Sequence, residues 1–154
     1  MYRIALIIIM FLSVTACSTI SKVSMENIDL LDAPESKFND EAAIYIFRGM
    51  NKAAAIWSFP VKLDGNQMGS IRRGQYVAFP ASEGPHSISI ICPSICEMPS
   101  IEAQGEFSAG KSYYFLLDPN IHSGYENMTM SFTLTQINKE KATSLMSTYT
   151  YISE

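Results

Sequence analysis

The chain has 154 residues and a formal net charge of −4, with 17% charged and 47% hydrophobic residues. This length fits a single domain of common size, and the apolar content is ample for one core. The negative charge argues against a nucleic-acid partner, which needs a basic patch.

The start of the chain has the layout of a secretory signal. Arg3 is followed by an unbroken apolar run from Ile4 to Leu12, and small or weakly polar residues come next. A transmembrane helix needs about 20 apolar residues, so this run is too short to span a bilayer. Residues 1–16 are therefore predicted to be a signal peptide. Without Arg3 the remaining chain is one unit more negative.

Val14, Thr15 and Ala16 directly precede Cys17, an order that resembles the bacterial lipobox. In that family of signals the cysteine thiol receives a diacylglycerol, the chain is cut before the cysteine, and the new amine is acylated. Cys17 is thus the predicted lipidation site, and the membrane is a predicted partner. Several acyl chains hold a protein stably, because each buried CH₂ contributes about 0.8 kcal/mol. Ser18 follows the cysteine, and by resemblance to enterobacterial sorting signals it favours the outer membrane, facing the periplasm.

A polar segment separates the signal from the rest of the chain. Residues 17–40 mix Ser, Asn, Asp, Glu and Lys and contain Pro34. We interpret them as the lipidated N-terminus and a flexible tether. Residues 41–154 are then the folded domain, placed in the envelope of a bacterial cell.

From Glu41 onward, strand patterns follow one another with turn residues between them. The expected strands are residues 42–47, 56–63, 67–72, 75–79, 86–92, 101–107, 111–118 and 128–134. The first is apolar on both faces, as in a central strand covered on both sides. Pro60 removes a ladder donor and predicts an edge or bulged strand. Asp64-Gly65 is a hairpin signal.

The last part of the chain has a helical pattern. Asn138 is a candidate N-cap, and Ala142, Leu145 and Met146 form a weak apolar stripe within residues 138–146. The spacing of strands and turns predicts a mostly β chain. We expect a small antiparallel β-sandwich or barrel with a short C-terminal helix, after a signal peptide and tether.

Cys92 and Cys96 are the cysteines left once Cys17 is lipidated. An oxidising compartment favours a disulfide between them, although so short a loop gives a small entropic gain. Free thiols remain open as an alternative. Metal or redox chemistry is less favoured, because a redox motif has two residues between its cysteines and a zinc site has about four ligands.

No catalytic, metal or cofactor site is predicted. His86 shares a strand face with apolar residues and is interpreted as a core or turn histidine, and His122 is placed in an exposed loop. No serine lies in a Gly-x-Ser-x-Gly frame, so a hydrolase triad is not expected. Glu102, Gln104 and Glu106 are interpreted as one solvated strand face.

Two features point to surfaces. Trp57, Tyr76 and Tyr114 are candidates for an aromatic binding patch, with core packing as the favoured interpretation. Arg72-Arg73 is interpreted as an exposed turn, with contact to anionic headgroups as the alternative.

Several motifs resemble, in order, a family of bacterial lipoproteins that carry a domain of unknown function. They are Ala43 to Arg48, Val61 to Gly65 with Gly69, Gly74 to Tyr76, Gly84 to His86 and Ala109 to Phe115. The family usually has proline before the glycine of its glycine-x-histidine motif, whereas here Pro85 follows Gly84. The segment from Cys92 to Cys96 is not part of the family pattern. The resemblance implies a small β-sandwich on a lipid anchor and implies no activity.

Three functions are consistent with these features. The leading hypothesis is a non-enzymatic interaction or structural module of the cell envelope, whose partner is an envelope protein or a glycan. The first alternative is a periplasmic ligand-binding lipoprotein for a small molecule or cell-wall glycan. The second is an inhibitor of a secreted hydrolase, with residues 92–96 as its contact loop.

Overall fold

The computed structural model describes residues 22–24, 38, 40–52, 54–94, 96, 98–123 and 128–152, with side chains except at 22–24 and 121–129. The predicted signal peptide, Cys17 and most of the predicted tether lie outside these residues. Within the described chain, no helix combines the length and apolar character needed to cross a membrane.

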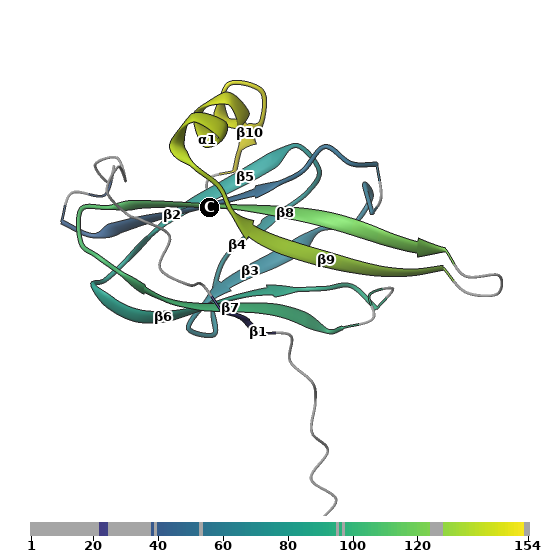
Figure 1. The fold of residues 1–154 in the computed structure, drawn as a ribbon, viewed down its shortest axis with the longest axis horizontal. Coiled ribbons are helices and arrows are strands. Elements are labelled where there is room, and N and C mark those ends of the chain that lie inside the picture. The colour runs from purple at the N-terminus through teal and green to yellow at the C-terminus, as the bar shows by residue number, and fades with distance from the viewer. Residues whose placement is uncertain are drawn as a thin grey trace, which may run out of the picture.

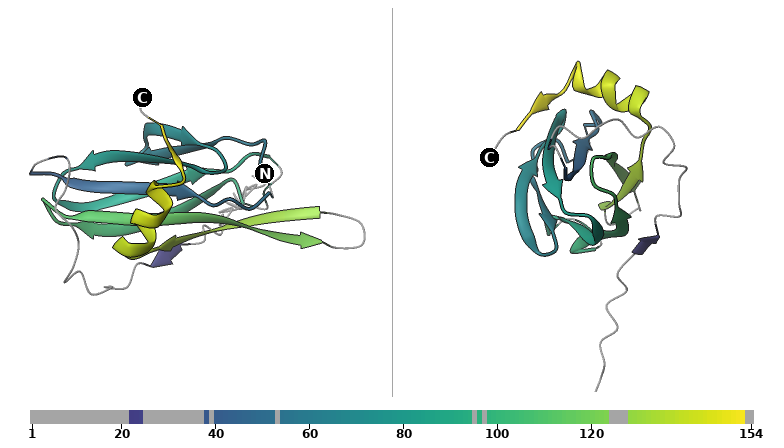
Figure 2. Two further views of the ribbon diagram at one scale, coloured as in Figure 1. Left: turned by 90° about the horizontal axis from the view of Figure 1, so that it is seen from above. Right: turned by 90° about the vertical axis from the view of Figure 1, so that its left-hand side faces the viewer.

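The described chain folds into two packed sheets of five strands each (Figure 1). One, the β6 sheet, has the order β1 (Lys22–Ser24), β7 (Ser100–Phe107), β6 (Gly84–Ile91), β3 (Phe59–Leu63) and β4 (Asn66–Ile71). The other, the β2 sheet, has the order β10 (Thr150–Tyr151), β5 (Gln75–Ala81), β2 (Ala42–Arg48), β8 (Ser112–Ser123) and β9 (Met128–Gln136). Helix α1 (Lys139–Met146) lies on the outer side of the β2 sheet (Figure 2).

The mostly β sandwich with a short C-terminal helix is confirmed. Its sheets are mixed rather than purely antiparallel, because β1 pairs parallel with β7, β10 with β5, and β2 with β8. Between β2 and β8 the chain visits the β6 sheet twice, through β3–β4 and β6–β7. These crossovers bring β8 beside β2 in the same direction.

Strand β2 is the centre of the fold. All of its residues from Ala42 to Arg48 are buried, which confirms the prediction of a strand covered on both faces. Ile44 and Ile46 face the core between the sheets, whereas Tyr45 and Phe47 belong to a second cluster on the outer face. Both clusters lie between Phe38 and Tyr149, so this stretch contains all the core side chains that the structure describes.

The outer face of the β2 sheet is aromatic and is covered by α1. The Tyr45 and Tyr114 ring centroids are 4.9 Å apart, and those of Phe47 and Tyr76 are 5.0 Å apart. Ala142 of α1 is fully buried against this cluster. Asn138 caps the helix as predicted, because its side chain accepts a hydrogen bond from the Lys141 N–H at 3.0 Å.

Strand β3 shows how Pro60 is accommodated. The strand lies between β6 and β4, so the predicted edge position is wrong. The predicted bulge is confirmed between Val61 and Lys62. Only residues 61–63 pair with β6, so Pro60 occupies the part of β3 whose neighbour is β4 alone and removes no bond to β6.

The tether prediction requires one addition. Residues 22–24 form β1 and pair with residues 102–104 of β7, so this part of the predicted tether is a sheet strand. Beyond β1, the outer face of the β6 sheet is polar: it presents Lys62, Ser87, Ser89, Glu102 and Gln104, which alternate with buried residues along their strands.

Candidate functional site

The turn between β3 and β4 places a carboxylate beside β6. Asp64 and Gly65 have φ values of 49° and 83°, which suits the two central positions of a type I′ hairpin turn. The Asp64 side chain accepts a hydrogen bond from the Ser87 N–H at 2.9 Å. The pKa of Asp64 is lowered, first by this backbone bond and then by its bond to His86.

His86 makes contacts through both ring nitrogens. Its Nδ1 lies 2.6 Å from Oδ2 of Asp64, and its Nε2 lies 2.9 Å from the carbonyl oxygen of Ser82. The pKa of His86 is raised, first by the Asp64 bond; burial opposes this shift, and the bond to the Ser82 carbonyl adds a smaller increase. The ring centroids of His86 and Phe107 are 6.0 Å apart. His86 therefore connects the β3–β4 turn and the β5–β6 turn at one end of the sandwich.

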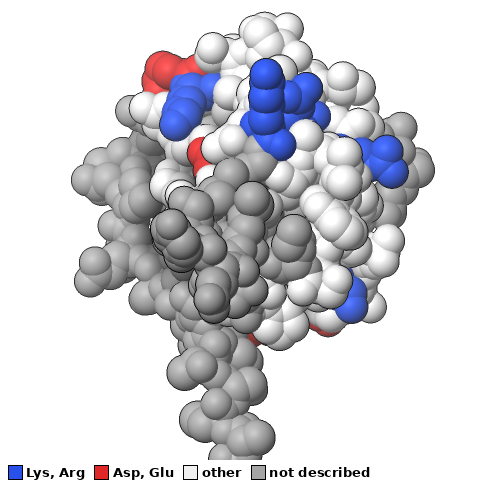
Figure 3. All heavy atoms as spheres, turned by 90° about the vertical axis from the view of Figure 1, so that its right-hand side faces the viewer, with Lys and Arg blue, Asp and Glu red and all other residues white. Residues whose placement is uncertain are grey.

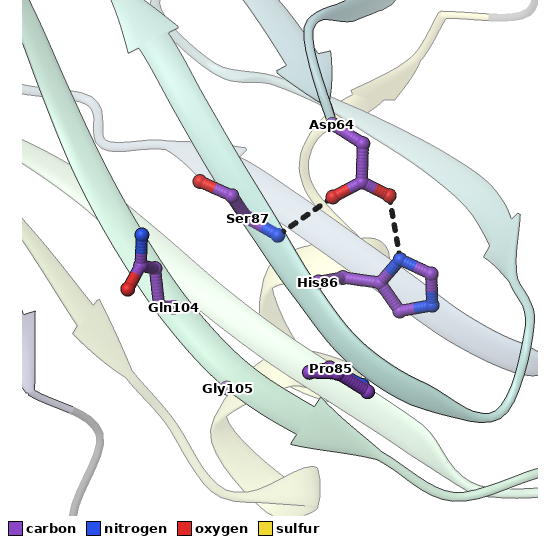
Figure 4. A pocket seen from close by; sticks show the side chains of 6 residues that line it. All are labelled: Asp64, Pro85, His86, Ser87, Gln104 and Gly105. Carbon is purple, nitrogen blue, oxygen red and sulfur yellow. Dashed lines mark hydrogen bonds and ion pairs between the residues drawn. The ribbon is translucent and has the colours of Figure 1, made fainter.

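An open pocket of about 490 Å³ lies beside this pair. Its lining residues are Asp64, Pro85, His86, Ser87, Gln104 and Gly105. Figure 4 shows Asp64 bonded to His86 and to the Ser87 backbone, with Gln104 approaching from β7. Ser87 and Gln104 are register partners across β6 and β7, so their side chains share the outer face of the β6 sheet. The pocket therefore presents the Ser87 hydroxyl and the Gln104 amide to a ligand, beside the Asp64–His86 pair, whose polar atoms already bond to each other.

The contacts of Ser82, His86 and Asp64 resemble a hydrolase triad but differ in one essential respect. Ser82 Oγ lies 3.2 Å from His86 Nε2. The nearer Ser82 carbonyl oxygen can only accept, so a protonated ring donates from Nε2 to this oxygen and from Nδ1 to the Asp64 carboxylate. The raised pKa of His86 favours this form. In it the ring has no lone pair for Ser82, and a general base needs one.

Sequence reasoning did not find Asp64, Ser82 or Gln104. Asp64 was interpreted only as a turn residue, and it is separated from His86 by 22 positions, a span that periodicity does not connect. The signal was present in the family-like motifs, because Asp64-Gly65 and the Gly84 to His86 segment meet at this site. His86 itself is a turn-linking histidine, as interpreted from the sequence.

Cys92 and Cys96 lie together in the β6–β7 connection, both half-buried against the inter-sheet core. Their thiols share a hydrogen bond and are reduced in the structure, and burial raises the pKa of Cys92 to about 12. The Cys96 N–H donates to the Pro93 carbonyl at 2.9 Å, which makes the turn that brings the sulfurs together. The backbone of Cys96 also forms an isolated parallel β-bridge with Met130 of β9, so this loop connects the two sheets.

The three aromatic candidates occupy two different clusters. Trp57 is half-buried and packs against the core between the sheets. Tyr76 and Tyr114 belong to the cluster under α1, where Tyr114 is 8% exposed. This placement agrees with the packing interpretation of these residues and does not bring them into one surface.

The remaining sequence candidates are dispersed. Glu102 is half-buried, whereas Gln104 and Glu106 are exposed on β7. Arg72 and Arg73 are exposed between β4 and β5. His122 belongs to β8 and pairs with Thr129 of β9, so the predicted loop position is wrong; its side chain lies outside the described part of the structure. Among the described residues, no group of three or more His, Cys, Asp or Glu side chains is arranged to hold a metal ion.

No family model matches the chain, and no curated protein matches it. The resemblance to the lipoprotein family therefore stays a prediction.

Proposed function

We propose that this chain is a lipid-anchored lipoprotein of the bacterial cell envelope whose sandwich domain acts as a non-enzymatic interaction module. The proposed anchor is Cys17, supported by the apolar run and the lipobox-like residues before it. The proposed location is the outer membrane, facing the periplasm. The proposed partner is an envelope protein or a glycan that meets the polar outer face of the β6 sheet.

The observation that carries the proposal is the bonding of His86. In the protonated ring both nitrogens donate to acceptors of the chain, and the histidine then offers no proton acceptor. In that form His86 holds the two turns in place and does not activate a nucleophile. Next to it, Ser87 and Gln104 present a hydroxyl and an amide, the groups that peptides and sugars bind by hydrogen bonds.

The two sheets differ in what they offer a partner. The β2 sheet is covered by the chain's own helix, whereas the outer face of the β6 sheet carries no such cover in the described residues (Figure 2). Its side chains are mostly polar, which suits a reversible contact with a modest interface. We therefore assign the interaction to the β6 sheet.

Site-specific photocrosslinking in living cells tests the proposal. A photoreactive side chain at Gln104 is expected to capture an envelope component. The matched control is the same side chain at Thr143, which is also exposed but lies on α1. Identical products from both positions, or turnover of an envelope substrate that His86→Gln abolishes, would contradict the proposal.

A second candidate function is favoured by the pocket itself. A volume of about 490 Å³ lies within the range of small-molecule sites, and Gln104 and Ser87 supply converging polar groups. In that case the ligand would be a small molecule or a cell-wall glycan fragment. Calorimetric titration with such fragments is expected to give saturable heat that Gln104→Ala reduces. If Gln104→Ala leaves the heat of binding unchanged, the ligand does not bind in this pocket, and the interaction module alone remains proposed.

A further inference from the structure

The two ends of the sandwich differ in charge. At one end lie the β3–β4 and β5–β6 turns and the neighbouring connections, with the exposed acids Asp40, Glu41, Asp64, Glu83 and Glu106 and the exposed cation Lys111. At the other end, residues 49–58 connect β2 to β3, and residues 72–74 connect β4 to β5. We call this second end the basic end and define it by Met50, Lys52, Ile56, Arg72 and Arg73.

The basic end combines cations with exposed apolar side chains. Met50 is 57% exposed and Ile56 is 83% exposed, whereas most large apolar side chains of the described chain are buried. Met50 lies directly against Gly74, because a Cβ built there would come 2.7 Å from its sulfur, so the two connections touch. Lys52, Arg72 and Arg73 are exposed, and among the described residues none of them takes part in an ion pair.

An acid at this end interacts with a buried cation. Asp118 is exposed on β8, beside Gly49. Its carboxylate acts electrostatically on Arg48, a fully buried residue whose guanidinium carbon lies 5.5 Å from the ring centroids of Phe59 and Phe132. Among the described side chains, the exposed cations of the basic end outnumber Asp118, and Figure 3, which views this end, shows more blue than red there.

The direction of β1 brings the start of the chain to the same end. Strand β7 begins at the basic end, after the β6–β7 connection, and β1 runs parallel to it, with Lys22 beside Glu102. Residue 22 is therefore nearer to the basic end than residue 24 is. Cys17 stands five positions earlier, and five residues span at most about 17 Å.

We propose that the basic end docks on the anionic headgroups of the bilayer, with Met50 and Ile56 entering the interface and the cations contacting phosphates. The inference rests on the proposed anchor at Cys17, which would hold this end within reach of the membrane. Interfacial binding combines buried apolar area with attraction to anionic lipid, and both contributions are present here. The acidic end and the pocket beside His86 then point away from the bilayer, toward a partner.

The test uses the chain from Ser18 onward, which contains all the core side chains that the structure describes and carries no lipid, so its outcome is independent of whether Cys17 is acylated. Trp57 is the chain's only tryptophan and lies in the connection that holds Met50 and Ile56. We expect the chain to bind phosphatidylglycerol vesicles at low salt, with Trp57 fluorescence quenched by brominated acyl chains. Phosphatidylcholine vesicles are expected to bind it far more weakly. Physiological salt should weaken the binding, because it shortens the Debye length to about 8 Å.

Charge variants locate the contact. Replacing both arginines (R72Q with R73Q) is expected to weaken partitioning about 30-fold, at roughly fivefold for each cation near an anionic surface. The matched control, K139Q with K141Q, removes the same charge from α1 and is expected to leave partitioning within about twofold. Replacing the two apolar residues (M50S with I56S) should abolish the Trp57 quenching. All variants should keep the melting temperature, since the changed side chains are exposed.

Three results would overturn the inference. One is no binding to phosphatidylglycerol vesicles, and another is binding without quenching of Trp57. The third is equal loss of binding in the arginine and lysine variants, which would show a general charge effect. None of these results bears on acylation, which the mass of the mature N-terminus measures separately.

Discussion

The outer faces of the two sheets have similar strand geometry but carry different kinds of side chain. On the β2 sheet the outward positions of β2, β5 and β8 are apolar and include the aromatic residues Tyr45, Phe47, Tyr76 and Tyr114, and the chain's own C-terminal helix packs against this cluster. On the β6 sheet the outward positions are mostly Ser, Gln, Glu and Lys. One face is thus buried under the helix and the other is uncovered in the described residues, so changes on the two faces should have different effects on stability.

The largest effect is expected under the helix. Phe47→Ala removes a fully buried ring stacked on Tyr76 and is expected to cost about 3–5 kcal/mol of unfolding free energy. Ser89→Ala on the β6 sheet should change it by less than about 0.5 kcal/mol. Urea unfolding of the two variants measures the difference, and similar losses would remove the distinction between the faces.

The helix itself gives the next effect. Ala142 has no exposed surface, so Ala142→Leu must push α1 away from Tyr45 and Tyr114, at a cost of about 1–3 kcal/mol. The exposed Thr143→Leu is the control, because it adds similar volume on the solvent side of the same helix. Thermal melting together with binding of an apolar dye reports both the loss and the uncovered aromatic face. Equal melting temperatures for the two variants would show that α1 does not pack as described.

A smaller effect is expected where one loop connects the two sheets. Oxidation of Cys92 and Cys96 would close a short loop and is expected to stabilise the domain by up to about 2 kcal/mol relative to the dithiol. The protein purified from an oxidising compartment should be lighter by two hydrogen atoms than after reduction. The double variant C92S/C96S should melt at the same temperature with and without reductant.

The reduced form, with two free thiols, is expected to react slowly with alkylating reagents at Cys92. Because burial raises the pKa of Cys92 to about 12, its thiolate is scarce at neutral pH. Alkylation of the folded, reduced protein should therefore be slow at Cys92 and fast after unfolding. Rapid labelling of Cys92 in the folded state would contradict the half-buried position of its thiol against the core between the sheets.

The smallest effect concerns pH at the edge of the open face. The raised pKa of His86 gives stability that is present below its ordinary value of 6.5 and is lost as pH rises through the folded value. The lowered pKa of Asp64 gives stability that is present above 3.8 and is lost as pH falls through the folded value. The pair should therefore contribute most between about pH 4 and 6.5.

The side chains of this pair are 12% and 46% exposed, so its contribution is expected to be at most about 1 kcal/mol. Unfolding at pH 5.5 and pH 8.5 should show a loss in the natural chain that His86→Gln does not show. A natural chain that is more stable at pH 8.5 than at pH 5.5, relative to this variant, would reverse the assigned protonation.

Local patterns in the sequence predicted local structure well. The doubly apolar run of β2, the Asp64-Gly65 hairpin and the Asn138 cap each depend on residues that are close in the chain, and all are found. Pairings between distant segments were not predictable in the same way. Alternation shows which residues share a strand face, but it does not show that β8 returns parallel to β2 or that β1 joins β7.

The candidate site illustrates the same limit. His86 was expected to be a core or turn histidine, but its partners Asp64 and Ser82 come from two different turns that only the sandwich brings together. Likewise, the sequence left a surface patch open as the alternative to core packing for Tyr114, because β8 is apolar on both faces. Only the position of α1 shows that its second face is buried.

The proposed envelope location and membrane docking depend most on the anchor at Cys17, and mass spectrometry of the mature N-terminus tests this anchor directly. The protein isolated from bacterial membranes is expected to begin at Cys17, with a diacylglycerol on the thiol and an acyl chain on the amine. The variant Cys17→Ser should leave the signal peptide uncut and lack both additions. A natural chain that carries an unmodified Cys17 would contradict the lipoprotein assignment and the membrane geometry built on it.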